Sequence, residues 1–306
     1  MKSHRLQSGE LSYYRDLGLP DTGLNLLRDH VAERAGVFFE DGKQDLLADK
    51  LADLVTGLGL SSFLDYYYLL KYDDPARLHW SALLDRLAVP ETYFWRQPEQ
   101  FGALANVIVP QYRRQNGNAP LRIWSAACCS GEEPLSIAMA LNEVGAFKHG
   151  PIEIVASDAS RSLIDRARSG VYGERSFRNL SDDLRSRYFT RTSNGWRIDP
   201  ELHSRVQWQT ANLVDPVQVT PLARANVIFC RNVFIYFSDQ TVRRIVRTFA
   251  QAMPAASYMF VGAAESLVRL STDLALEEIG SAFVYVKKTG SEANTASAGA
   301  LDSWPN

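Results

Sequence analysis

The stretch from Leu121 to Met139 holds the residues whose types and spacing best fit ligand chemistry. An apolar segment is followed by small residues from Ser125 to Gly131, and then by two adjacent acids, Glu132 and Glu133. This order predicts a buried strand, a sharp turn that a ligand can approach closely, and a helix that begins directly after the turn. We therefore expect a ligand-binding junction between a strand and a helix.

The paired acids indicate which ligand fits. A phosphate would normally occupy the positive end of a helix, and two carboxylates there favour a cationic guest. The segment has one glycine and no lysine, so it matches neither GxGxxG nor GxxxxGK[ST]. A ligand that carries an ammonium and a sulfonium fits best. Ser130 and Glu133 form a capping-box pattern, with Pro134 in the first turn. The alternative is that Glu133 only caps the helix and Glu132 is only solvated.

A third acid, Asp158, ends the apolar segment 152–158 and precedes a predicted helix at 161–168. In open α/β sheets, an acid at the end of the second strand binds the two hydroxyls of a ribose. We expect this role for Asp158. The alternative, that it is the N-cap of the helix beginning near Ser160, is compatible with it.

The other segments surround this junction. Residues 24–87 have helical spacing, with Gly57 and Gly59 as stop signals, and the aromatic run at 63–68 is most simply core and rim. Residues 188–213 alternate like short antiparallel strands. The expected parts are a helical domain at 20–88, a connector and linker helix at 89–114, an α/β domain at 115–289 with a β insert at about 186–210, and a disordered tail at 290–306.

Composition excludes several classes. The 306 residues contain no apolar run long enough for a bilayer span, and only three cysteines, which form no CxxC pattern. The balance of 33 basic and 35 acidic residues argues against a nucleic-acid binder. We expect a soluble, cytoplasmic monomer without a metal site and without direct membrane insertion.

Four motifs stand in a specific order: ETYFWR at 91–96, WSAACCSGEEPLSIAM at 124–139, IVASD at 154–158 and FCRNVFIYF at 229–237. Together they resemble the CheR family of chemoreceptor glutamate methyltransferases, over roughly residues 20–288. The resemblance implies an α/β fold, a class I methyltransferase-like doubly wound sheet with a small antiparallel β insert, preceded by an all-α N-terminal domain. It also implies S-adenosylmethionine as cofactor, with S-adenosylhomocysteine as product.

The resemblance assigns roles residue by residue. Glu133 resembles the acid that binds the methionine amino group, and Asp158 the ribose acid. The remaining cofactor contacts implied are Thr92, Arg96, Asn212, Leu213, Arg231 and Asn232. Arg96 and Tyr236 are the implied catalytic pair, with the tyrosine close to the transferring methyl. The alternatives are an ion pair of Arg96 with Glu91 or Glu99, and a merely buried Tyr236.

The implied activity is methyl ester formation on glutamate side chains of a chemoreceptor's cytoplasmic domain, for receptor adaptation in chemotaxis signal transduction. A glutamate is already ionised at neutral pH, so no general base is needed. Three alternatives stay open: a non-chemotaxis signalling receptor, another substrate such as RNA or a small molecule, and a non-catalytic cofactor-binding interaction protein.

The partner surface departs from the family pattern. The second helix lacks the arginines that meet the receptor in chemotaxis members, whereas 161–205 has 10 arginines against 6 acids. We therefore expect Arg185, Arg187 and Arg191 to bind the receptor directly, without a C-terminal pentapeptide tether. The alternative is that these arginines are solvated or paired with Asp182 and Asp183.

Overall fold

The computed structural model describes residues 12–271 and 273–287 of the chain. The contacts divide it into two compact units, with the division between Val89 and Pro90. The tail expected at 290–306 lies outside the described residues. Within the described ranges, no helix is both long enough and apolar enough to cross a membrane.

The first unit is helical, as the sequence predicts. Its helices are α1 (Tyr13–Asp16), α2 (Leu24–Ala35), α3 (Gln44–Gly57), α4 (Phe63–Tyr72) and α5 (Leu78–Leu87). Their apolar faces form one core around buried side chains such as Leu27, Leu51 and Leu83. The expected stop signal is present, because α3 ends at Gly57 and Gly59 has a left-handed φ of 71°.

The aromatic run of α4 is core and rim, as expected. Phe63 and Tyr66 are fully buried, and Tyr67 is nearly so. Tyr68 is half exposed and packs on Tyr67 with the ring centroids 5.5 Å apart. The aromatic residues of α4 are therefore explained by packing within the first unit.

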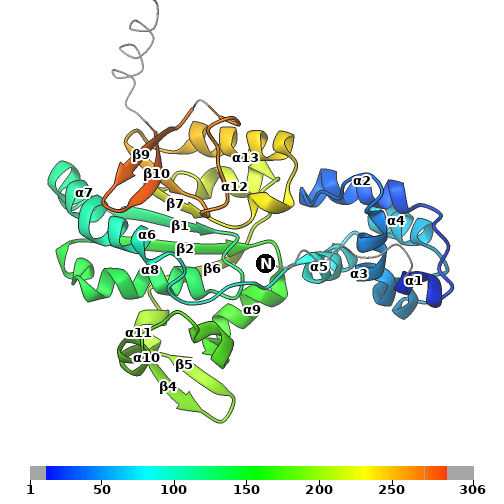
Figure 1. Ribbon diagram of the computed structural model, residues 1–306, viewed down its shortest axis with the longest axis horizontal. Coiled ribbons are helices and arrows are strands. Elements are labelled where there is room, and N and C mark those ends of the chain that lie inside the picture. Colours follow the sequence, from blue (N-terminus) through cyan, green and yellow to red (C-terminus); the bar gives the residue numbers. More distant parts are fainter. Residues whose placement is uncertain (1–11, 272, 288–306) are drawn as a thin grey trace, which may run out of the picture. The chain divides into compact units, whose positions relative to one another are not determined.

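The second unit is built on a mixed seven-stranded sheet of order β6-β2-β1-β7-β8-β10-β9 (Figure 1). The strands are β1 (Leu121–Ala126), β2 (Ile152–Asp158), β6 (Val206–Thr210), β7 (Val227–Cys230), β8 (Ser257–Phe260), β9 (Ala275–Ile279) and β10 (Ala282–Lys287). The first five strands in this order are parallel, and β10 is antiparallel to both of its neighbours.

Helices cover both faces of this sheet (Figure 1). One face packs on α6 (Pro98–Ala103), the π-helical turn η1 (Leu104–Ile108), α7 (Val109–Asn116), α8 (Glu132–Glu143) and α9 (Arg161–Ser169). The other face packs on α12 (Pro216–Leu222) and α13 (Asp239–Ala252). Two short 3-10 helices, η2 (Ala146–His149) and η4 (Phe234–Tyr236), follow α8 and β7. This confirms the doubly wound α/β arrangement that the family resemblance implies.

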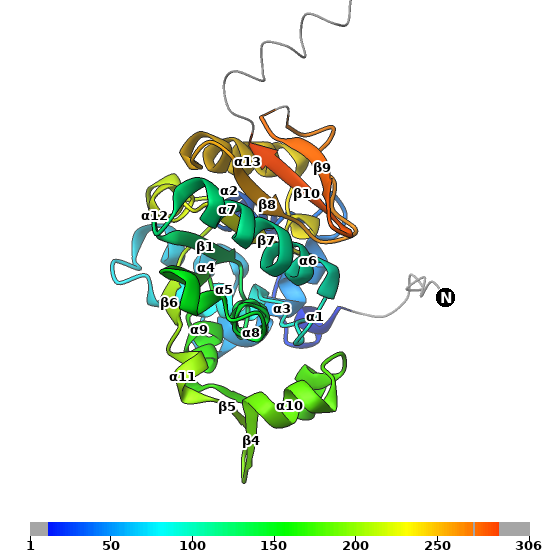
Figure 2. The same ribbon diagram turned by 90° about the vertical axis from the view of Figure 1, so that its left-hand side faces the viewer.

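A smaller sheet of order β3-β5-β4 projects from the main sheet (Figure 2). We call the segment from Val171 to Ile198 the insert. It contains β3 (Val171–Tyr172), the 3-10 helix η3 (Glu174–Phe177), α10 (Asp182–Tyr188), β4 (Phe189–Thr192) and β5 (Gly195–Ile198), and it is followed by α11 (Pro200–His203). The strands pair antiparallel, as the sequence predicts.

One strand prediction was wrong. The segment 206–210 was expected among the antiparallel strands of the insert, but β6 pairs parallel with β2 in the main sheet. Polar and apolar residues alternate in β6 because it is an edge strand of the main sheet. Most of its side chains are therefore only partly buried. A second strand, β9, was not predicted at all, since its centre is the acidic pair Glu277 and Glu278, which suits an exposed sheet edge.

Candidate active site

The acids and polar residues singled out in the sequence gather at one edge of the main sheet. β2, β1 and β7 are adjacent and parallel, so their carboxyl ends lie side by side. These ends carry Asp158 after β2, the small-residue turn after β1, and Arg231 with Asn232 after β7. Such an edge is where open α/β sheets bind ligands.

The turn after β1 is held in an uncommon backbone conformation. Ala127, Cys129 and Gly131 have φ values of 56°, 52° and 96°. Two of them are not glycine, and left-handed strain of this kind clusters at ligand sites. A Cβ on Gly131 would lie 2.8 Å from the Trp208 ring, so a larger residue there would displace the turn. We call residues 127–131 the β1 turn.

The capping box predicted for Ser130 and Glu133 was wrong. Helix α8 begins at Glu132 after the N-cap Gly131, which provides no side-chain cap. The hydroxyl of Ser130 instead donates to the Glu132 carboxylate at 2.7 Å. Glu132 is 1% exposed, which excludes the alternative that it is only solvated. Pro134 lies in the first turn, as expected.

Glu133 is a buried carboxylate with two partners. It accepts a hydrogen bond from the Ser125 hydroxyl at 2.7 Å and pairs with Arg231 at 3.3 Å. Burial raises the pKa of Glu133, and the positive charge of Arg231 opposes this shift. The side chain therefore does not cap the helix, and its charge is available at the sheet edge.

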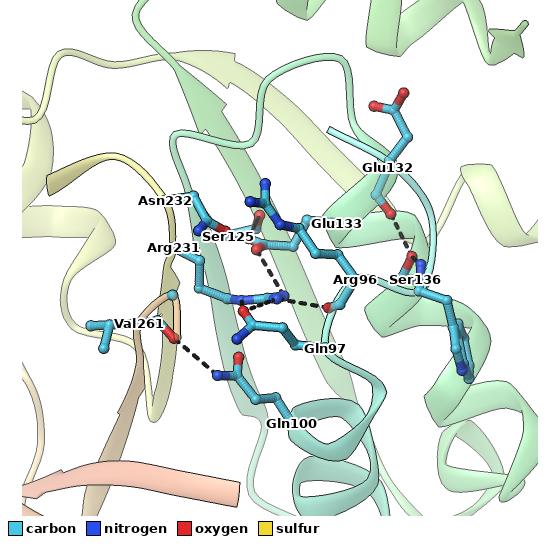
Figure 3. Close-up of polar contacts among 12 residues, drawn as sticks. Arg96, Gln97, Gln100, Ser125, Glu132, Glu133, Ser136, Arg231, Asn232 and Val261 are labelled. Carbon is cyan, nitrogen blue, oxygen red and sulfur yellow. Dashed lines mark hydrogen bonds and ion pairs between the residues drawn. The ribbon is translucent and has the colours of Figure 1, made fainter. Parts of the chain in front are cut away.

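Arg231 lies beneath this carboxylate and is 6% exposed. Its guanidinium also donates to the backbone carbonyl of Arg96 at 2.7 Å and to the Gln97 side-chain oxygen at 2.6 Å (Figure 3). Trp95 and Gln97 have left-handed φ values of 63° and 60°. We call residues 91–97 the connector. Arg231 thus joins the end of strand β7, Glu133 and the connector. Its direct contact with a cofactor stays a prediction.

A residue to which the sequence analysis gave no role, Glu265, shapes the loop after β7. Its carboxylate accepts hydrogen bonds from the backbone amides of Asn232 at 2.8 Å, Phe234 at 2.8 Å and Gly262 at 2.7 Å. Asn232 has a left-handed φ of 59°. A Cβ on Gly262 would lie 2.5 Å from the side-chain amide nitrogen of Asn232. The detectable signal is an acid shortly after a buried strand, the same pattern that singled out Asp158.

Asp158 ends β2, as predicted, and also holds the β1 turn. Its carboxylate accepts the backbone amide of Cys129 at 2.9 Å and that of Ser160 at 2.9 Å. The N-cap of α9 is Ser160, whose hydroxyl accepts the Leu163 amide. Asp158 is therefore not the N-cap. An ionised carboxylate only accepts hydrogen bonds, and its two oxygens suit the two hydroxyls of a diol.

The predicted catalytic pair comes from two different elements. Arg96 donates to the backbone carbonyl of Glu91 at 3.1 Å, whereas the Glu91 carboxylate binds Arg178. In the described part of the chain Arg96 forms no ion pair, so the ion-pair alternative was wrong. Burial raises the pKa of Tyr236, and the nearby positive charge of Arg96 lowers it. The roles of Arg96 and Tyr236 toward a substrate stay predictions.

The other predicted contacts lie at the same strand ends or on the connector. Thr92 is partly exposed on the connector. Asn212 and Leu213 follow β6, where the Asn212 side chain accepts the Val214 amide at 3.2 Å and Leu213 is buried. Their roles toward a cofactor stay predictions.

The arginines predicted to bind a partner differ in their surroundings. Arg185 binds Glu174 at 2.6 Å and stacks over Trp196 at 3.9 Å. Arg187 pairs with Glu143 and with Asp183. Arg191 is exposed and lies 5.8 Å from the Trp196 ring. The alternative thus holds for Arg187, which pairs with Asp183, and the exposure of Arg191 fits both a solvated side chain and a partner-binding one, so its role stays a prediction.

These residues fit a ligand with a cationic amino-acid end and a ribose. Glu133 provides a carboxylate for an ammonium, and Asp158 provides acceptors for hydroxyls. The β1 turn between them contains only small residues, so its backbone can be approached closely. No lysine or glycine-rich phosphate cradle is present in this turn.

Comparison with known proteins agrees with this geometry. Residues 90–282 match the profile of the CheR methyltransferase SAM-binding domain, and residues 22–88 match that of the CheR methyltransferase all-alpha domain. The chain is 30% identical to chemotaxis protein methyltransferase 2 of Vibrio cholerae, over 84% of this chain and 90% of that protein.

Two further relatives carry different names. The chemotaxis protein methyltransferase of Escherichia coli K12 is 32% identical, over 83% of this chain and 87% of that protein. The probable biofilm formation methyltransferase WspC of Pseudomonas aeruginosa is 34% identical, over 75% of this chain but only 53% of that longer protein.

Proposed function

The chain belongs to the CheR methyltransferase family, and from this premise we propose that it methylates glutamate side chains in the cytoplasmic domain of a chemoreceptor. The methyl donor is S-adenosylmethionine, as in the family. The observation that supports the proposal is the shared sheet edge, where Glu133, paired with Arg231, and Asp158, bonded to the β1 turn, follow adjacent strands. We place the protein in the cytoplasm, where such receptor domains lie.

When bound, the cofactor supplies an electrophilic methyl group on a sulfonium. Glu133 would hold the ammonium end, and the Asp158 carboxylate, which also accepts the amides of Cys129 and Ser160, would hold the ribose. Arg231 keeps the Glu133 carboxylate in place and balances part of its charge. The chain would thus bind and orient the donor with groups that hydrogen bonds and an ion pair hold in place, which lowers the entropy lost in the reaction.

The acceptor side needs no general base, since a glutamate carboxylate is the nucleophile at neutral pH. Arg96 is free of an acidic partner in the described residues and can hold that carboxylate through two parallel hydrogen bonds. Tyr236, next to Arg96, lines the approach of the carboxylate. Catalysis then consists of holding oxygen, carbon and sulfur in line.

Transfer of labelled methyl groups to a purified receptor cytoplasmic fragment tests the function. The label should be released by mild base, as expected of a glutamate methyl ester, and should be absent when the fragment's candidate glutamates are replaced by alanine. Transfer RNA and free amino acids serve as control substrates. Methylation of a control but not of the receptor would exclude the proposal.

A second candidate is a receptor outside chemotaxis. The similarity to a probable biofilm formation methyltransferase over 75% of the chain favours it. The same labelling assay with receptors from both kinds of pathway of the source cell distinguishes the two. Whichever receptor gives the higher kcat/KM is the assigned substrate.

For the partner surface, Arg191 is the exposed member of the three arginines and stands on the projecting strand β4 (Figure 2). We expect Arg191→Glu to raise the KM for the receptor at least threefold at low salt, because a receptor rich in glutamate is steered by positive charge. The affinity for S-adenosylhomocysteine should stay unchanged. Arg205→Glu, which alters an exposed arginine of an ion pair outside the insert, is the control. If ionic strength had no effect, or if removal of the receptor's C-terminal peptide abolished methylation, direct docking would be excluded.

The ribose assignment predicts a loss of cofactor affinity on substitution of Asp158. Asp158→Ala should weaken S-adenosylhomocysteine binding by about 1.5–3 kcal/mol, since a charged acceptor of hydrogen bonds is removed. Calorimetry measures the change, and Asp165→Ala, which removes an exposed acid of the adjacent helix α9, is the control. An unchanged affinity would mean that Asp158 does not hold the ribose.

The raised pKa of Glu133 predicts a pH dependence of binding. Below that pKa the side chain is neutral and loses its attraction to the ammonium, which stays protonated throughout the acid range. Affinity for S-adenosylhomocysteine should therefore fall as pH falls through the raised pKa, by up to about tenfold per pH unit. Glu133→Gln should bind weakly at all pH values and lose this dependence. A wild-type affinity that is flat between about pH 7 and pH 4 would contradict the assignment.

A further inference from the structure

Glu132 is a buried acid that the proposed mechanism does not use. It precedes Glu133 by one residue, yet its side chain points in a different direction (Figure 3). It is 1% exposed, and within the described ranges it has no ion-pair partner. A buried carboxylate without a cation is costly unless hydrogen bonds compensate, so its partners indicate why this position is acidic.

Its two carboxylate oxygens bind two different segments. One accepts the Ser130 hydroxyl of the β1 turn at 2.7 Å, and the other accepts the Ser176 hydroxyl of the insert at 2.8 Å. Tyr172, also in the insert, donates its hydroxyl to the backbone carbonyl of Ser130 at 3.1 Å. The insert is therefore attached to the β1 turn by hydrogen bonds, directly through Tyr172 and by a bridge through the Glu132 carboxylate.

The same residues hold the connector. The backbone carbonyl of Glu132 accepts the Ser136 hydroxyl at 2.7 Å, and the Ser136 oxygen accepts the Trp95 amide at 3.0 Å. The backbone carbonyl of Ser176 accepts the Phe94 amide at 2.8 Å. Phe94 and Trp95 directly precede Arg96. The Glu132 side chain thus joins the β1 turn to the insert, and the connector is bonded to the same group through Ser136 and the Ser176 carbonyl.

We propose that Glu132 is a positioning residue whose side chain joins the β1 turn to the insert, and through Ser176 supports the connector, so that the turn keeps its ligand-binding conformation only while the insert is attached to it. The left-handed residues Ala127 and Cys129 need such support, because neither is a glycine. The inference rests on the proposed function in one respect, which is that the β1 turn binds the cofactor.

The test compares Glu132→Gln and Ser176→Ala, alone and together, with the wild type. Glu143→Gln is the matched control, because Glu143 also joins α8 to the insert, through Arg187 and Tyr188, but at the opposite end of the helix. The measurements are S-adenosylhomocysteine affinity by calorimetry, thermal unfolding, and amide hydrogen exchange of residues 127–131 in the ligand-free protein.

We expect Glu132→Gln to weaken binding about tenfold or more and Ser176→Ala to weaken it less, with a double variant no weaker than Glu132→Gln alone. Exchange in the β1 turn should increase in both single variants, whereas Glu143→Gln should keep wild-type affinity and exchange. This pattern separates positioning from general stability, which the thermal measurement reports.

Wild-type affinity and exchange in a folded Glu132→Gln protein would overturn the inference, as would an equal loss of affinity in Glu143→Gln. If Glu132→Gln does not fold, Ser176→Ala decides, and unchanged binding and exchange in that variant overturn it. A wild type that binds no S-adenosylhomocysteine would instead refute the cofactor assignment, and the exchange measurement would still test the attachment by itself.

Discussion

An Arg231→Leu variant should lose about 3–5 kcal/mol of the free energy of unfolding of the second unit, because the buried Glu133 carboxylate is left without its cation. The Arg231 side chain is 1% exposed and that of Glu133 is 15% exposed, so water replaces the lost partner only in part. The Arg96 carbonyl and the Gln97 side chain lose a donor as well. Urea unfolding measures the loss, and amide exchange of strand β7 assigns the transition to this unit.

The matched control is Arg122→Leu. Arg122 pairs with Glu153 at 2.9 Å on the surface, where the two side chains are 57% and 42% exposed. Exposed pairs contribute about 0–1 kcal/mol, so this variant should remain near the wild type. A second Glu133→Leu substitution should recover part of the stability of Arg231→Leu but not cofactor binding. Equal effects of the two arginine substitutions would contradict the burial argument.

The sheet could be predicted where strands are buried on both faces. Strand β7 (Val227–Cys230) is apolar and buried throughout and β1 (Leu121–Ala126) is buried except at Arg122, and the polar residues after them mark the ligand edge. The prediction failed at the sheet edges. There β6 and β9 are only partly covered, so their sequences resemble a separate antiparallel strand or a loop. Burial by distant segments, which a local pattern does not contain, decides these cases.

The candidate site shows the same division. Glu133 and Asp158 could be found because each acid directly follows a turn or a strand. The support of Glu133 by Arg231, and the burial of Glu132, could not be found, since both depend on contacts with the connector or the insert. The left-handed backbone of Trp95 also has no local signal, because the residue is not a glycine. Its conformation follows from the packing around it.

The second large effect is expected on turnover. Arg96→Ala should lower kcat by about 10²-fold or more, because a misplaced reactant loses the alignment that proximity provides. It should also weaken S-adenosylhomocysteine binding, since the Arg96 charge lies near Glu133 and Tyr236. Arg96→Lys keeps the positive charge but lacks the paired N–H donors of the planar guanidinium. Compared with Arg96→Ala, it should therefore recover cofactor binding more than turnover. Single-turnover methylation and calorimetry separate the two quantities.

Tyr236→Phe should instead affect turnover alone. The ring remains in η4, so cofactor affinity should stay within about twofold, whereas a hydroxyl that orients the carboxylate is lost and kcat falls by about tenfold or more. Tyr112→Phe is the control, because its hydroxyl binds the Pro120 carbonyl at 2.9 Å on α7, outside the ligand edge. Full turnover in Tyr236→Phe would show that the hydroxyl is not used. Loss of turnover together with a matching loss of affinity would place Tyr236 among the cofactor contacts instead, because a group that acts only on the acceptor cannot change the binding of the donor's product.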